Sequence, residues 1–167
     1  MAEDNPMQTT PTTVSKPLVL GPGEGRRFAT ITVKTDAGSS PMAVFESELP
    51  PGVLVAPPHV HHEYTESFYV LAGEVDFRVA ERTVRCPAGA LVHVPPGVVH
   101  GFHNPGPDPA RLLILVHPAA GLGLIEGMYA LLAGGTPDPT ALSALFAQHH
   151  SALMSAEGGS TGSDHDS

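Results

Sequence analysis

Cationic side chains are scarce in this chain, which has only 8 lysines and arginines against 17 acidic residues and a formal net charge of −9. Binding to nucleic acid requires a basic face that neutralises phosphates, and anionic membranes attract polybasic segments. We therefore expect no nucleic-acid partner and no membrane partner. A small neutral, aromatic or cationic ligand remains compatible with this charge.

Cysteines and long apolar runs are also lacking. Cys86 is the only cysteine, so the chain has no internal disulfide and no site with several thiolate ligands. No stretch reaches the roughly 18 apolar residues that a membrane-spanning helix needs. The N-terminal sequence MAEDNPMQTTPTTVSK has no apolar region of the signal-peptide kind. We interpret the protein as cytoplasmic and Cys86 as chemically inert.

Tryptophan is absent and aromatic residues make up only 5% of the chain, whereas proline and glycine occur 18 times each. This composition favours short strands joined by tight turns, and the length suits one domain. Runs typical of strands are RRFATITV (26–33), MAVFESEL (42–49), SFYVLAG (67–73), VDFRVA (75–80), TVRC (83–86), ALVHV (90–94), VVHGFH (98–103) and RLLILVH (111–117). The sequence therefore predicts a mainly β fold, either a sandwich or a small barrel.

The pattern changes after Pro118, where apolar residues follow helical spacing. A first short helix is predicted to end at the two glycines 134–135, and Asp138 and Pro139 are suited to begin a second one. The predicted organisation is a flexible N-terminal arm (1–16), a β-barrel (17–118), a C-terminal helical extension (119–154) and a disordered tail (155–167).

The segment PPHVHHEYTE (57–66) contains three histidines, a tyrosine and two glutamates in ten positions. On a strand, residues two apart share a face, so His59 and His61 point the same way and can bind one cation. Glu66 shares a face with Phe68 if the strand restarts there, and a buried carboxylate is costly without a partner such as a metal ion. Three interpretations compete for this segment: a solvated loop, a satisfied polar core, or half of a metal site.

A second histidine-bearing segment follows the turn formed by Pro95 and Gly97. There His100 begins a new strand that crosses back toward the first segment and would supply a fourth ligand. His62 and His103 are expected to face away from this site. His93 and His117 lie in apolar strands, where they either line a pocket or are hydrogen-bonded core residues; both alternatives stay open.

The spacing of the two segments resembles a known family. The first reads G-x6-H-x-H-x4-E-x6-G from Gly52 to Gly73, and the second reads G-x5-P-x-G-x2-H-x3-N from Gly89 to Asn104. In this order they resemble the two conserved motifs of the cupin superfamily, over roughly residues 40 to 118. The resemblance implies a jelly-roll β-barrel with one divalent transition metal ion (iron, nickel, manganese, copper, cobalt or zinc) as cofactor. The residues matching the family's metal ligands are His59, His61, Glu66 and His100.

The chain further resembles small single-domain cupins of the quercetin dioxygenase-like kind. This resemblance implies a metal-dependent dioxygenase acting on a small aromatic or enolic substrate, with Glu66 as the catalytic base that takes a hydroxyl proton. Two alternatives remain: a non-redox cyclase or isomerase of polyketide-like substrates, and a binding protein without turnover. The arginines of the predicted 75–86 hairpin fall on the surface, which argues against a phosphosugar substrate. Cupins commonly pair, so a homodimer is expected.

Overall fold

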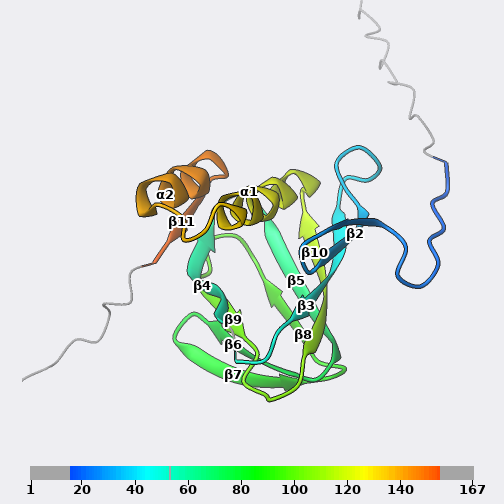
Figure 1. Ribbon diagram of the computed structural model, residues 1–167, viewed down its shortest axis with the longest axis horizontal. Helices are drawn as coiled ribbons and strands as arrows, with labels where there is room; N and C mark the ends of the chain where they lie inside the picture. The colour runs from blue at the N-terminus through cyan, green and yellow to red at the C-terminus, as the bar shows by residue number, and fades with distance from the viewer. Residues whose placement is uncertain (1–15, 53, 155–167) are drawn as a thin grey trace, which may run out of the picture.

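The computed structural model describes residues 16–52 and 54–154, so the predicted tail and all but the last residue of the predicted arm lie outside the described residues. Two antiparallel sheets face each other (Figure 1). One sheet has the order β1 (Arg26–Phe28), β2 (Ile31–Thr35), β3 (Ala43–Leu49), β10 (Ala110–His117), β5 (Thr65–Ala72) and β8 (Leu91–Val94). The other has the order β11 (Ser151–Leu153), β4 (Leu54–His61), β9 (His100–His103), β6 (Glu74–Val79) and β7 (Arg82–Pro87).

Between β3 and β10 the chain passes repeatedly from one sheet to the other, which makes the barrel a jelly roll. Alternate residues of β3 and β10 point inward, as the period of a strand requires. Phe68, Phe77 and Phe102 pack together in the interior with ring centroids 5.3 to 5.6 Å apart. The predicted fold class, a mainly β jelly-roll barrel with two C-terminal helices, is confirmed.

One predicted run is divided in the structure, and one strand, β4, was not among the predicted runs. The run 26–33 is not one strand, because Ala29 adopts a positive φ of 45° and turns the chain into the β1–β2 hairpin. Strand β4 contains Pro57 and Pro58, and its register with β9 shifts between Ala56 and His59. Proline has no N–H to donate, so it is tolerated where the hydrogen-bond ladder is irregular.

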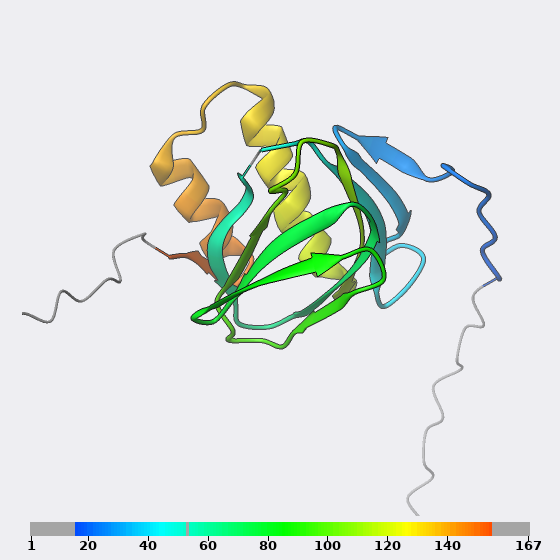
Figure 2. The same ribbon diagram turned by 90° about the horizontal axis from the view of Figure 1, so that it is seen from below.

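Two helices follow the barrel, α1 (Leu122–Ala133) and α2 (Pro139–Gln148), after a short 3-10 turn at Ala119–Gly121. The carboxylate of Asp138 accepts from the backbone N–H groups of Thr140 and Ala141, as the predicted cap requires. Seen from below, α1 crosses the end of the ring formed by the strands (Figure 2). Within the described residues, neither helix is long and apolar enough to span a bilayer.

The segment after α2 was predicted only as part of a helical extension, but it returns to the barrel. Strand β11 pairs antiparallel with β4, so that Ser151 lies opposite His61 and Leu153 opposite His59. The C-terminal segment therefore adds an edge strand to the five-stranded sheet, next to the strand that carries two of the predicted ligands.

The close approach of β4 and β9 can be tested at Gly101. A Cβ atom added there would lie 2.7 Å from the carbonyl oxygen of Ala56 and 3.1 Å from the nitrogen of Pro58. Because strand backbone would have to move, we expect Gly101→Ala to lower the free energy of unfolding by about 1–3 kcal/mol, measured by urea denaturation. Gly38→Ala is the matched control: Gly38 lies in an exposed turn, and a Cβ atom added there would lie 3.4 Å from its nearest neighbour, Oδ1 of Asp36. Equal stability of the two variants would contradict this packing.

Candidate metal centre

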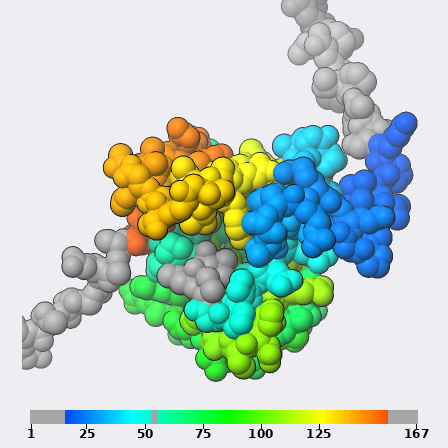
Figure 3. Space-filling model, viewed as in Figure 1, coloured from blue at the N-terminus to red at the C-terminus, as the bar shows by residue number. Residues whose placement is uncertain are grey.

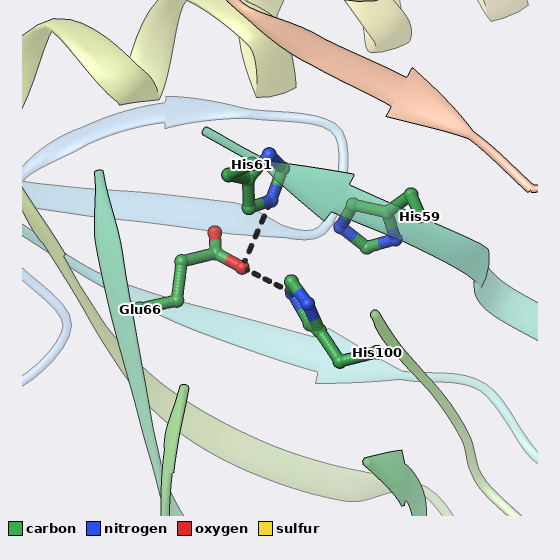
Figure 4. A group of neighbouring side chains, drawn as sticks. All are labelled: His59, His61, Glu66 and His100. Atoms are coloured by element: carbon green, nitrogen blue, oxygen red, sulfur yellow. Dashed lines mark hydrogen bonds and ion pairs between the residues drawn. The ribbon is translucent and has the colours of Figure 1, made fainter. Parts of the chain in front are cut away.

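Four side chains from three strands converge inside the barrel (Figure 4). His59 and His61 extend from β4, Glu66 from β5 and His100 from β9. All four are buried, and one potential ligand atom from each lies within 4.8 Å of the others. The structure thus brings together the four residues that the sequence singled out, and together they could hold one metal ion.

Strand pairing explains this convergence. His59 lies opposite His100 across the β4–β9 pair, with ring centroids 4.3 Å apart, and His61 follows two residues later on the same face. Glu66 comes from β5 in the facing sheet, so its carboxylate reaches the imidazoles across the barrel interior. The cluster therefore exists only when the two sheets are closed on each other.

The backbone sets the orientation of two imidazole rings. Nδ1 of His59 lies 2.8 Å from the carbonyl oxygen of Pro57, and Nδ1 of His100 lies 3.0 Å from that of Val98. A carbonyl oxygen can only accept, so in both rings Nδ1 carries the proton. In the neutral ring this leaves a lone pair on Nε2, the form in which histidine binds a metal ion.

Burial strongly lowers the pKa of His59. Desolvation, reinforced by the neighbouring imidazoles of His100 and His61, lowers the pKa of His59 to about 4. The ring is therefore neutral near neutral pH. A metal ligand must be deprotonated in this way, so the environment prepares His59 for coordination.

Glu66 provides the negative charge of the cluster. Its Oε2 lies 2.9 Å from Nε2 of His100 and 3.3 Å from Nε2 of His61. Burial by itself would raise the pKa of Glu66, but the contacts with His100 and His61 outweigh it and hold this pKa below its usual range. A carboxylate oxygen and an Nε2 lone pair are both acceptors, so their close contact requires a proton or a metal cation between them.

His61 supplies a direct test of whether a metal ion fits. Its Nε2 is buried and has no hydrogen-bond partner among the described residues, since the contact with Glu66 lies outside hydrogen-bond geometry. A buried polar atom without a partner is costly. A cation bound by this atom, the other two imidazoles and the carboxylate would remove that cost, so the residues present fit a metal ion.

A cavity of about 360 Å³ opens beside the cluster, with His59, His61 and Glu66 in its wall. The six-stranded sheet and α1 supply most of its apolar lining, and neither lysine nor arginine is among the lining residues. The larger apolar side chains are Ile31, Phe45, Phe68, Phe102, Ile114, Leu124, Ile125, Met128, Leu132 and Phe146. In the space-filling view, α1 and α2 lie directly against the barrel (Figure 3). The helices therefore help to enclose an apolar chamber that ends at the cluster.

Some sequence-based expectations about neighbouring residues are wrong. Tyr64, for which the sequence indicated no role, is buried and stacks on His61 with ring centroids 4.0 Å apart. His93 and His117 neither line the cavity nor lie in the core: both are exposed, and their Nδ1 atoms contact Ser67 and the carbonyl oxygen of Pro41. In an apolar strand, alternation alone does not tell which face is inside.

One contributor to the cluster was missed altogether. Ser151, in β11, places its Oγ 2.8 Å from Nδ1 of His61. A serine in a short segment near the end of the chain carries no motif, so no local signal pointed to it.

Asn104, the last position of the second motif, lies away from the cluster. Its side-chain amide donates to the backbone carbonyl oxygens of Leu49 and Asp108.

Comparison with known proteins gives matches over part of the chain. Residues 45–116 match the family model described as the cupin domain. Germin-like protein 5-1 of Oryza sativa subsp. japonica is 37% identical over 92 residues, which are 50% of this chain and 39% of the rice protein. The chain thus spans well under half the length of that relative.

Solved structures also align with part of this chain. A predicted oxalate decarboxylase from Thermotoga maritima aligns with 24% identity and a TM-score of 0.49, over 53% of this chain and 78% of its own. An uncharacterised protein with a double-stranded β-helix domain from Klebsiella pneumoniae aligns with 26% identity and a TM-score of 0.48, over 61% of this chain and 84% of its own.

Removing one imidazole tests the cluster as a metal centre. We expect His100→Ala to lower the affinity for Zn²⁺ or Co²⁺ by more than the roughly 10- to 100-fold that loss of an outer-shell partner costs. Competition with a chromophoric chelator measures this affinity. His93→Ala, which removes an exposed imidazole from the outer face of the barrel, is the control and should bind like the wild type. Full metal binding by His100→Ala would refute the ligand assignment.

Proposed function

Because this chain contains a cupin domain with three imidazoles and one carboxylate buried at the inner end of an apolar cavity, we propose that it is a metal-dependent enzyme for a small apolar substrate. The ligands in this proposal are His59, His61, Glu66 and His100. The observation that carries it is the convergence of three ring nitrogens and one carboxylate oxygen on one point beside the cavity. Such a donor set suits iron, nickel, manganese, copper, cobalt or zinc.

Our first candidate function is that of a dioxygenase, which acts on an aromatic or enolic molecule of the flavonol or polyketide type. A bound redox-active ion would supply oxygen activation and Lewis acidity there. The apolar walls would hold a flat ring and exclude water, as hydrophobic pockets do for drug-sized ligands. The absence of lysine and arginine from the lining supports an uncharged substrate over a phosphosugar.

Glu66 is the proposed catalytic base. Of the two glutamates that line the cavity, Glu66 is buried and Glu48 is exposed. A substrate hydroxyl next to Glu66 would transfer its proton to a carboxylate oxygen, leaving an enolate or phenolate and a neutral carboxylic acid. The phenol of Tyr64 does not compete as a base, because burial and then the negative charge of Glu66 raise its pKa above its usual value.

The second candidate is a non-redox cyclase or isomerase for polyketide-like molecules. It is favoured by the same pairing of a buried carboxylate with an apolar cavity, since proton transfer next to an enolisable carbon needs no oxygen. The nature of the resident ion discriminates between the two candidates. A redox-active ion is required for oxygenation, whereas zinc serves as a Lewis acid only.

Elemental analysis of protein purified without added metal, chelator or a nickel column is the first test. We expect a stoichiometric redox-active ion and oxygen consumption when a flavonol is added. Stoichiometric zinc with turnover of an enolisable substrate in the absence of oxygen would replace the dioxygenase by the cyclase or isomerase. Only traces of metal, with no uptake on titration, would refute the enzyme proposal and leave a small-molecule binding protein.

The apolar wall of the cavity can be tested at Met128 on α1. Met128→Glu puts a charge where the proposed substrate presents apolar surface, so we expect the Kd for a flavonol to rise about 10-fold or more. Absorbance titration of the metal-loaded protein measures this Kd, and the metal content should not change. Ala130→Glu, at an exposed position of the same helix, is the matched control. Equal Kd values for the two variants would argue against binding in this cavity.

A further inference from the structure

The C-terminal strand β11 reaches the candidate metal centre through one side chain. Ser151 lies opposite His61 in the β4–β11 register, and its side chain is buried. Its Oγ is 2.8 Å from Nδ1 of His61, although the two residues are 90 positions apart in the chain. The ring of His61 is thus held by a side chain, whereas the rings of His59 and His100 are held by backbone carbonyls.

The direction of this hydrogen bond follows from a second one. Ser151 Oγ also lies 2.8 Å from the carbonyl oxygen of His149, which can only accept a proton. The single hydroxyl proton of Ser151 is therefore directed to His149. Toward His61 the hydroxyl can then only accept, so the proton of that ring sits on Nδ1 and its Nε2 lone pair points into the cluster.

Tyr64 completes this support. Its ring stacks on His61 at an interplanar angle of 24°, and its hydroxyl lies 3.4 Å from Ser151 Oγ. In that contact the tyrosine hydroxyl is an acceptor, but at 3.4 Å it competes poorly for the proton of Ser151 with the carbonyl oxygen of His149 at 2.8 Å. The imidazole of His61 is therefore held on its face by Tyr64 and at its edge by Ser151.

We propose that Ser151 is a positioning residue of the metal centre, which holds His61 with its proton on Nδ1 and its Nε2 directed at the metal ion. This inference rests on the metal binding proposed above. It makes β11 part of the functional site, although this strand lies beyond the residues 45–116 that match the cupin family model. Metal affinity then depends on the docking of the C-terminal segment onto β4.

The test compares Ser151→Ala with Ser151→Thr, which keeps a hydroxyl. Outer-shell partners of metal-bound histidines typically contribute 10- to 100-fold to affinity, so we expect about that loss for Zn²⁺ in Ser151→Ala and recovery in Ser151→Thr. Competition with a chelator measures the affinity. Ser143→Ala, at an exposed position of α2, is the matched control and should bind Zn²⁺ like the wild type.

Imidazole ¹⁵N resonances of the metal-free protein give a second readout, recorded at a pH where the ring of His61 is neutral. We expect the proton on Nδ1 in the wild type and in Ser151→Thr, and a shift of the proton toward Nε2 in Ser151→Ala. A wild-type ring protonated on Nε2 would overturn the inference even if Ser151→Ala did not fold. Loss of affinity in Ser151→Ala with the proton still on Nδ1 would overturn it too, because strand docking alone would explain the loss.

The two proposals fail in different ways. If the wild type bound no metal ion, the proposed function would be wrong, and the metal-free resonances would still decide whether Ser151 sets the protonation of His61. If the wild type bound Zn²⁺ and Ser151→Ala bound it equally well, only the role of Ser151 would be wrong.

Discussion

The burial of one carboxylate among three imidazoles is the constraint on which the rest of this structure depends. Glu66 is held inside a barrel whose core is otherwise built largely from apolar side chains. Burying a charge in such surroundings is costly unless it is paired. Here the pairing groups are ring nitrogens whose other nitrogens are already committed to hydrogen bonds. The centre is thus organised for a cation, either a proton or a metal ion, and the barrel supplies the dry surroundings.

Different elements of the fold contribute different parts of this centre. The β4–β9 pair presents the imidazoles, and β5 brings the carboxylate from the facing sheet. The two helices that follow the barrel enclose the apolar cavity. Phe146 from α2 packs against His59, which extends the cavity lining to the cluster itself. Strand β11 then supports His61 from outside. The C-terminal extension therefore helps to shape both the proposed substrate chamber and the proposed ligand set.

Features encoded by neighbouring residues could be predicted, and features that depend on distant segments could not. The shared face of His59 and His61 follows from the two-residue period of a strand, and the start of α2 follows from Asp138 and Pro139. The prediction that His93 and His117 lie in a pocket or in the core failed because their strands are apolar on both faces, so alternation leaves the inward face undecided. The homodimer and the cytoplasmic location stay predictions.

The sequence by itself determined the mainly β fold and its two helices, because strand periodicity and turn residues are local properties of the chain. The resemblance of its two motifs to those of cupins implied the jelly roll and the four candidate ligands, because motif spacing is local too. Only the tertiary structure decided that β11 returns to β4, that Tyr64 stacks on His61, and that Ser151 forms a hydrogen bond with that ring. These contacts join residues up to 90 positions apart. They depend on strand register and on barrel closure, and no spacing within one segment encodes either.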